Sequence, residues 1–251
     1  MTPGEAVHIH SPVSFLNGHE LMIITMMILD YIIVFMILSM GTSSMKLKPG
    51  KSQNLVEWSV TYICNYADDL IGKKEARRFY PLFVMLFFYI FVGNLLGLVP
   101  GLVSPTSMLS VTVALAVIVF VYEWVSGIAK NGPINYLRHY AGGPGIPAAL
   151  KPFMFFVELL SDISRPLSLS FRLFGNILAK EILLGVLIVL VLLFWPSVTT
   201  NGISAFLAGF SFILRPLIII LGVLVSLIQA AVFTLLAMIY IAGAVAAHEE
   251  H

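Results

Sequence analysis

Nine charged residues stand inside long apolar segments of this 251-residue chain, and their chemistry is the strongest lead to function. They are Asp30, Glu123, Glu158, Asp162, Arg165, Arg172, Lys180, Glu181 and Arg215. A charge at the centre of a membrane costs about 2.5–3.5 kcal/mol, so such residues line a wet path, form pairs, or reach the interface from a helix end. We expect Glu123, Glu158, Asp162 and Arg165 to lie near the cytoplasmic interface of the membrane. We also expect Arg215 to have no part in ion transport.

Arg172 differs because it stands about 20 residues into its apolar run, too far from either end to reach water easily. Its guanidinium group keeps its proton at any physiological pH. A permanent positive charge at this depth can attract a carboxylate without taking its proton, and it blocks direct proton passage. The alternative is a buried ion pair with Glu158 or Glu181.

Helical geometry places further polar residues on the side of Arg172. At about 100° per residue, a first group lies within about 40° of Arg172 and a second at about 80°. The first group is Glu158, Ser161, Arg165, Ser168 and Asn176, and the second is Asp162 and Lys180. Glu181 falls on the opposite face, so it needs another helix or a separate pocket. Polar groups on both sides of Arg172 indicate two aqueous half-paths separated by a fixed charge.

The last apolar run carries a sparser polar stripe. Gly222 and Tyr240 lie within about 20° of Gln229, and Ser226 lies at about 60°. Gln229 can face Arg172 without cancelling its charge. Polar contacts of this kind also join membrane helices without any other role, so both interpretations stay open.

The composition indicates an all-α integral membrane protein. Hydrophobic residues make up 59% of the chain and charged residues 11%, against about 25% charged in soluble domains. With 14 basic and 13 acidic residues there is no basic excess to bind nucleic acid. Cys64, the one cysteine, cannot form an internal disulfide, and no metal-binding or cofactor motif occurs. We therefore expect no cofactor and no metal.

Five membrane-crossing elements are expected, together with an interfacial or hairpin helix, and the last two are very long and tilted. The predicted division is an outer tail at 1–20, a first membrane helix at 21–40, an interfacial region at 53–80, a membrane hairpin at 81–128, two long helices that form the ion path at 152–246, and a cytoplasmic tail at 247–251. The hairpin consists of apolar runs at 81–103 and 110–128.

Basic residues set the orientation. Of the 14 lysines and arginines, ten follow the first or the third apolar run, whereas 1–20, 100–107 and 196–202 contain none. Basic loops stay on the cytoplasmic side, which predicts an outer N-terminus and a cytoplasmic C-terminus. No basic residue precedes Lys46, so the N-terminus is not expected to be a signal peptide.

The runs at 152–195 and 203–246 are each about 44 residues, or about 66 Å as helix, twice the hydrocarbon core of about 30 Å. Each could be two spans that turn at Pro166 or Pro216, or one strongly tilted helix. We favour tilted helices because 152–195 offers little polar turn sequence. A short motif at 161–167 recurs at 211–217, as a trace of duplication or as a repeated Arg-Pro kink.

The stretch 170–176, Ser-Phe-Arg-Leu-Phe-Gly-Asn, closely resembles the signature of subunit a of the F-type ATP synthase membrane sector. The resemblance is strong from about 151 to the C-terminus, moderate over 80–130, and weak before that. Its other supporting positions are Glu158, Pro166 to Leu169, Glu181, Gln229 and Tyr240.

The resemblance implies a non-enzymatic stator subunit that conducts protons or sodium ions through two offset half-channels. Ions would load and leave acidic residues on a ring of c subunits, and Arg172 would separate the two channels. Asn176, Glu181 and Gln229 resemble entry-side or interface residues, and Glu158, Ser161 and Ser168 resemble exit-side residues. Implied partners are the c-ring, the peripheral-stalk b subunits, membrane lipid and, indirectly, the ATPase head. The implied location is a bacterial inner membrane rather than a thylakoid.

Three positions depart from the pattern of that family. Lys180 and Gly222 stand where many members have glycine and histidine, and we hypothesise that Lys180 reaches into the entry path beside Gly222. The alternative is that Lys180 pairs with Glu181 or reaches outward to water. Gly97 stands where some members carry an entry-side aspartate, and Asn94 is a candidate substitute.

Two other classes of membrane protein share some of these features. A cation-coupled secondary transporter would act by itself and usually has more spans and clearer repeats. A quinone-site subunit of a respiratory complex lacks support, because all six histidines lie in tails or loops: His8, His10, His19, His139, His248 and His251.

Overall fold

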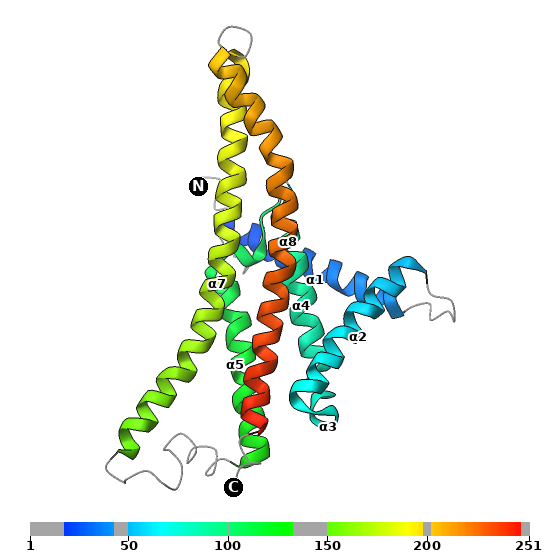
Figure 1. The fold of residues 1–251 in the computed structure, drawn as a ribbon, viewed down its shortest axis with the longest axis vertical. Helices are drawn as coiled ribbons and strands as arrows, with labels where there is room; N and C mark the ends of the chain where they lie inside the picture. The colour runs from blue at the N-terminus through cyan, green and yellow to red at the C-terminus, as the bar shows by residue number, and fades with distance from the viewer. Residues whose placement is uncertain (1–17, 43–49, 100, 133–149, 198–201, 247–251) are drawn as a thin grey trace, which may run out of the picture.

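The computed structural model describes residues 18–42, 50–99, 101–132, 150–197 and 202–246 (Figure 1). Within these ranges every regular element is helical, which confirms the predicted all-α class. The predicted tail at 247–251 and most of the tail at 1–20 lie outside the described residues.

The first elements are α1 (Gly18–Thr42), α2 (Lys51–Ile71) and α3 (Lys73–Ala76). Gly72 separates α2 from α3 with φ of 90°, a conformation that favours glycine because it has no Cβ. Leu55, Trp58 and Tyr62 of α2 are all strongly exposed, and the rings of Trp58 and Tyr62 stack with centroids 5.8 Å apart. An exposed aromatic stripe beside polar residues is typical of a helix at the membrane interface.

The hairpin that follows consists of α4 (Tyr80–Leu96), the short helix η2 (Pro105–Ser107) and α5 (Leu109–Asn131). Within the predicted apolar run at 81–103, the helix α4 ends at Leu96. Gly97, Pro100 and Gly101 follow in the sequence, and glycine and proline both disfavour helix. The chain instead folds back, so that Ser104 Oγ donates to the carbonyl oxygen of Gly93 at 2.7 Å.

The last two helices are α7 (Lys151–Phe194, 44 residues) and α8 (Gly202–Ala246, 45 residues), with η3 (Trp195–Ser197) after α7. Pro166 and Pro216 lie inside these helices, so each run is one long element rather than two spans. In Figure 1 the two helices run side by side in opposite directions as a long hairpin, and α4 and α5 lie against its lower part.

Four described helices are long and apolar enough to cross a membrane, namely α1, α5, α7 and α8. α4 is also apolar but has 17 residues, the lower limit of about 17 residues for a span. With α4 included, the described part of the chain agrees with the five crossing elements expected from the sequence.

The main apolar core joins α4, α5, α7 and α8 and fixes the rotation of α7 about its axis. Leu169, Leu173 and Ile177, spaced by four residues, are buried in this core together with Phe83 of α4 and Phe233 of α8. Because these three residues hold one face of α7 inward, Arg172 and Asn176 lie on its exposed side.

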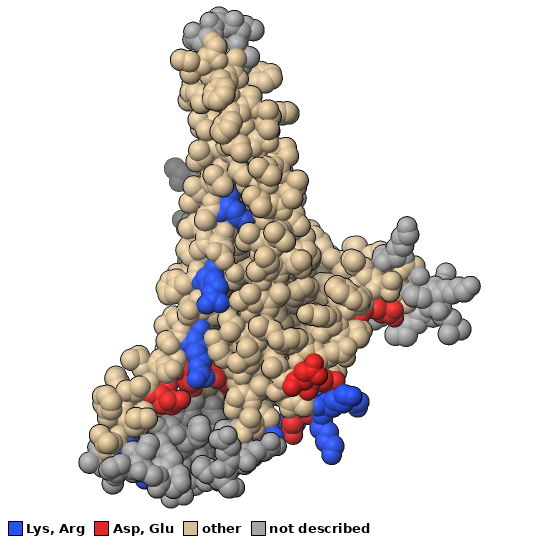
Figure 2. All heavy atoms as spheres, in the orientation of Figure 1, with Lys and Arg blue, Asp and Glu red and all other residues tan. Residues whose placement is uncertain are grey.

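The outer surface of the bundle is itself apolar. Large side chains along the long hairpin are exposed, among them Leu192 at 69%, Ile213 at 74% and Phe171 at 56%. Figure 2 shows the hairpin as an almost uninterrupted surface of uncharged residues. Such a surface suits contact with lipid or with another membrane protein.

Ile239 and Ile241, which lie on nearly opposite faces of α8, test this packing. Ile241 is fully buried in the core, whereas Ile239 is 43% exposed. We expect Ile241→Ala to lower the free energy of unfolding by roughly 3 kcal/mol, because it leaves a cavity, and Ile239→Ala to have little effect. Thermal unfolding of the detergent-solubilised variants measures the difference, and equal losses would contradict the described rotation of α8.

Candidate functional site

Arg172 lies exposed at the middle of α7, without an ion pair to any described residue. Glu181, one of the two partners considered for it, is engaged elsewhere, since its Oε1 accepts a hydrogen bond from the backbone N–H of Ser104 at 3.1 Å. Figure 2 shows Lys and Arg atoms as small patches along the hairpin among uncharged residues, the lowest of them next to acidic atoms. The guanidinium group of Arg172 is therefore available to a group outside this chain.

On one side of Arg172, which the basic residues predict to face outward, lies a polar group that we call the outer cluster: the buried Asn94, Ser104, Thr106, Lys180 and Ser226 and the half-buried Glu181. Lys180 is 9% exposed, and its Nζ donates to Ser226 Oγ at 2.8 Å and to the carbonyl oxygen of Asn94 at 3.2 Å. Lys180 therefore neither reaches outward to water nor forms a direct ion pair with Glu181 among the described contacts.

Glu181 faces α4 and the segment after it, on the side of α7 opposite Arg172, as its angular position predicts. A Cβ added at Gly97 would lie 2.9 Å from Glu181 Oε1 and 2.9 Å from Ser104 Cβ. A side chain at position 97 would collide with the carboxylate. The acidic group beside this turn of α4 thus comes from α7, which gives a physical reason for glycine at 97.

Lys180 was predicted to reach into the entry path beside Gly222, and the structure places Leu98 against Gly222. The space beside Gly222 is filled by Leu98, whose Cδ2 lies 2.6 Å from where a Cβ at 222 would stand. Lys180 instead contacts Ser226, one turn further along α8, whose hydroxyl donates to the carbonyl oxygen of Gly222 at 2.7 Å.

Asn176 and Gln229 link the two long helices close to Arg172. Asn176 Nδ2 donates to Gln229 Oε1 at 2.8 Å, and Gln229 is 4% exposed. The partner of Gln229 is therefore Asn176, one turn along α7 from Arg172. Gln229 Nε2 is buried and has no hydrogen-bond partner among the described groups.

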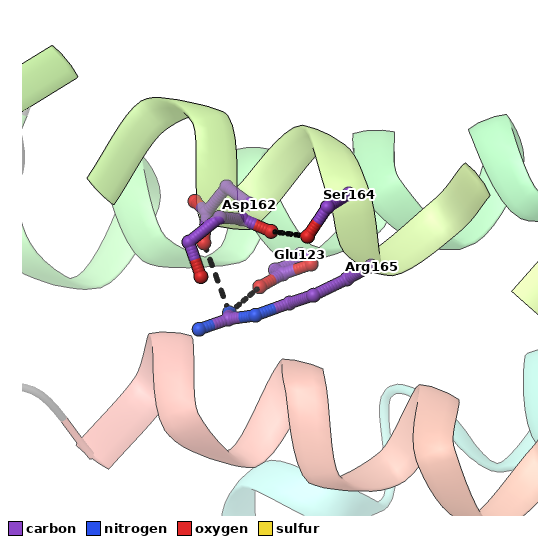
Figure 3. Close-up of polar contacts among 5 residues, drawn as sticks. Glu123, Asp162, Ser164 and Arg165 are labelled. Carbon is purple, nitrogen blue, oxygen red and sulfur yellow. Dashed lines mark hydrogen bonds and ion pairs between the residues drawn. The ribbon is translucent and has the colours of Figure 1, made fainter. Parts of the chain in front are cut away.

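On the other side of Arg172 lies the inner cluster, which comprises Glu123, Asp162, Arg165 and Tyr240. Arg165 Nη1 lies 3.2 Å from Glu123 Oε1 and 3.0 Å from Asp162 Oδ1, so one guanidinium group joins two carboxylates (Figure 3). Its Cζ also stands 5.6 Å from the ring centroid of Tyr240. Glu123 and Asp162 are each 3% exposed, so both carboxylates are enclosed by the bundle, and their position near the cytoplasmic interface stays a prediction.

The remaining predicted residues on this side are not part of the inner cluster. Ser161 and Ser168 are exposed and Glu158 is half-buried. The carbonyl oxygen of Ser161 accepts a hydrogen bond from Ser164 Oγ at 2.6 Å. All three stay on the stripe shared with Arg172, on the surface of α7.

Arg172 separates the two clusters along the helix axis. At about 1.5 Å per residue, Arg165 lies about 10 Å from Arg172 in one direction, and Lys180 about 12 Å in the other. No described group of three histidine, cysteine or acidic residues is placed to hold a metal ion. The arrangement is a single exposed cation between two separate sets of buried polar groups.

Comparison with known proteins bears on this arrangement. Residues 22–242 match the family model described as ATP synthase A chain. Among similar proteins, ATP synthase subunit a of Aliarcobacter butzleri is 39% identical over 94% of both chains, and that of Helicobacter hepaticus is 35% identical over 93% of this chain and 94% of its own. The Helicobacter pylori protein is 36% identical over 94% of this chain and 95% of its own.

The chain belongs to the ATP synthase A chain family. The match runs from within the first turns of α1 to the last turns of α8, and it includes the part before residue 80, where the sequence resemblance was weak. Membership confirms that resemblance and decides against the transporter and respiratory-subunit alternatives.

In this A chain, sequence reasoning missed the grouping of Glu123 and Asp162 with Arg165, and the roles of Ser104 and Thr106 in the outer cluster. Glu123 is the one acidic residue of α5, which was a usable signal. The positions of Ser104 and Thr106 depend on the chain folding back after α4, and no local pattern indicates that turn.

The inner cluster predicts unequal effects of two substitutions. Arg165→Met leaves the buried carboxylates of Glu123 and Asp162 without their cation, and we expect a loss of roughly 3 kcal/mol. Glu123→Gln leaves Arg165 paired with Asp162 and should cost far less.

Thermal unfolding of the solubilised chain compares the two variants. A variant that combines Arg165→Met with Glu123→Gln leaves only the Asp162 carboxylate without a cation, whereas Arg165→Met alone leaves two. The combined variant should therefore recover part of the stability that Arg165→Met loses. Equal losses from both single substitutions would contradict this geometry.

Proposed function

We propose that this chain is the stator subunit of a rotary ATP synthase and that Arg172 separates two half-channels, through which protons or sodium ions reach and leave carboxylates on a ring of c subunits. One observation carries the proposal: Arg172 is exposed, lacks an ion pair with any described residue, and lies between two separate buried polar clusters. Family membership supports it.

The outer cluster forms the entry side in this proposal. Its carboxylate, Glu181, lies beside the hydroxyl and amide groups of Ser104, Thr106 and Asn94. From there the pair of Asn176 and Gln229 leads along the hairpin toward Arg172. An ion that reaches Glu181 can thus pass to a ring carboxylate near the middle of α7.

Arg172 prevents the ion from crossing directly. Its charge cannot be removed, so it attracts the ring carboxylate once that group has lost its ion, and repels a cation moving along α7. One elementary charge that crosses about 100 mV carries about 2.3 kcal/mol, and a leak would lose this energy. The ring must therefore turn to connect the two paths.

The inner cluster forms the exit side. Glu123 and Asp162 provide two carboxylates and Tyr240 a hydroxyl group, and the predicted exit-side residues Glu158, Ser161 and Ser168 lie on the adjoining stripe of α7. Arg165 holds both carboxylates in place. An ion released from the ring reaches the cytoplasm through this part of the bundle.

The proposed setting is the inner membrane of a bacterium, with the N-terminus outside and the C-terminus in the cytoplasm. The distribution of basic residues supports this orientation. The exposed apolar face of the hairpin that carries Arg172 suits the c-ring, and the other exposed helices suit lipid and the peripheral-stalk b subunits.

Substitution of Arg172 tests the proposal directly. We expect Arg172→Ala to abolish ATP synthesis driven by an ion gradient in membrane vesicles, with the complex still assembled. Arg215→Ala is the matched control, since Arg215 lies on α8 outside both clusters, and it should retain most activity. Normal ATP-driven pumping by Arg172→Ala would overturn the assignment.

Lys180 is expected to set the pH range of synthesis. An ammonium group in the entry path repels protons while charged and stops doing so once high pH removes its proton. Lys180→Gly should therefore raise synthesis at acidic pH relative to alkaline pH. Lys180→Arg, which keeps its charge, should lower synthesis at alkaline pH. The rate of proton-driven ATP synthesis is measured across pH for both variants. Profiles that match that of the native chain would contradict this role of Lys180.

A further inference from the structure

Gly93 of α4 and Gly97, which directly follows the end of this helix, lie about one turn apart, and a carboxylate from another helix stands beside each of them. A Cβ added at Gly97 would lie 2.9 Å from Glu181 Oε1 of α7. A Cβ added at Gly93 would lie 2.8 Å from Asp30 Oδ2 of α1. Residues four apart share one face of a helix, so the two acids approach the same face of α4.

Asp30 is fully buried although it is a charged residue inside a membrane helix. Its side chain is 0% exposed, and neither carboxylate oxygen has a hydrogen-bond partner among the described groups. An ionised carboxylate carries a large desolvation cost in such a place, and a bound proton removes it. Asp30 thus has no structural partner here that explains its presence.

Ser104 connects the surroundings of the two carboxylates. Its hydroxyl donates to the carbonyl oxygen of Gly93 at 2.7 Å, and its backbone N–H donates to Glu181 at 3.1 Å. The same hydroxyl is 2.7 Å from Thr106 Oγ1, which donates to Asn94 Oδ1 at 2.8 Å. Pro105 closes the place beside Gly93, with its Cγ 3.4 Å from the added Cβ.

We propose that Asp30 is a further proton-binding group of the outer half-channel and supplies protons to Glu181 past Ser104. This rests on the proposed function and adds a second acid, contributed by α1, to the entry path. Asp30 passes its bound proton to the Glu181 carboxylate and takes a new proton from outside water, and Glu181 then passes the proton it received on to a ring carboxylate. Each acid returns to its earlier state, and no other bond changes.

The test measures passive proton flux through the assembled membrane sector, in vesicles from which the ATPase head has been removed. We expect Asp30→Asn, which keeps the shape but holds no exchangeable acid proton, to reduce flux at least tenfold. Tyr31→Phe, the exposed neighbour on α1, is the matched control and should leave flux unchanged. Glu181→Gln is measured in parallel, and assembly is followed by co-purification with the ring.

The outcomes separate this inference from the function on which it rests. Loss of flux in both acid variants, with normal assembly, supports the role of Asp30. Full flux in Asp30→Asn with loss in Glu181→Gln overturns the inference and leaves the proposed function standing. Full flux in both variants overturns the entry path itself.

A second measurement covers the case in which Asp30→Asn does not assemble. Asp30→Cys in a Cys64→Ser background should react with a small water-soluble thiol reagent added from the outside, and not from the cytoplasmic side. Lack of reaction from the outside, or equal reaction from both sides, overturns the inference.

Discussion

The cost of a charge inside an apolar bundle governs the arrangement of this protein. Charged groups that α7 directs into the bundle are joined to other polar groups: Lys180 to Ser226 and Asn94, Glu181 to Ser104, and Asp162 to Arg165. Arg172 is exposed at the centre of the same helix instead. A cation left at this depth without a described partner is stabilised only if another molecule supplies the counter-charge, which links its position to the function we propose.

Two features of the fold supply the polar groups that the long hairpin lacks. The segment after α4 folds back and places Ser104 and Thr106 against α7, on the outer side of Arg172. α5 places Glu123 against Arg165 on the inner side. The unbroken length of α7 then keeps both clusters at fixed heights on either side of Arg172, since a rigid helix transmits its register over many turns.

Periodicity and length predicted the long helices, the polar stripe and the separate facing of Glu181, because these depend on repeats within one element. Contacts between different helices could not be predicted in this way. The pairing of Glu123 with Arg165 and the position of Leu98 beside Gly222 were not predicted, because neither the approach of α5 nor the path of the chain after α4 follows from a local sequence pattern. Asp30 stood out as a charge in an apolar run, but only the packing of α1 on α4 shows that it meets Gly93.

The central claim is that Arg172 faces a carboxylate of the ring. The most direct measurement is a structure of the complete membrane sector that resolves side chains. Our account predicts that the Arg172 guanidinium lies against the ring, within about 4 Å of a ring carboxylate or separated from it by one water molecule. An Arg172 side chain that points to lipid, or that pairs with an acid of its own chain, would contradict it.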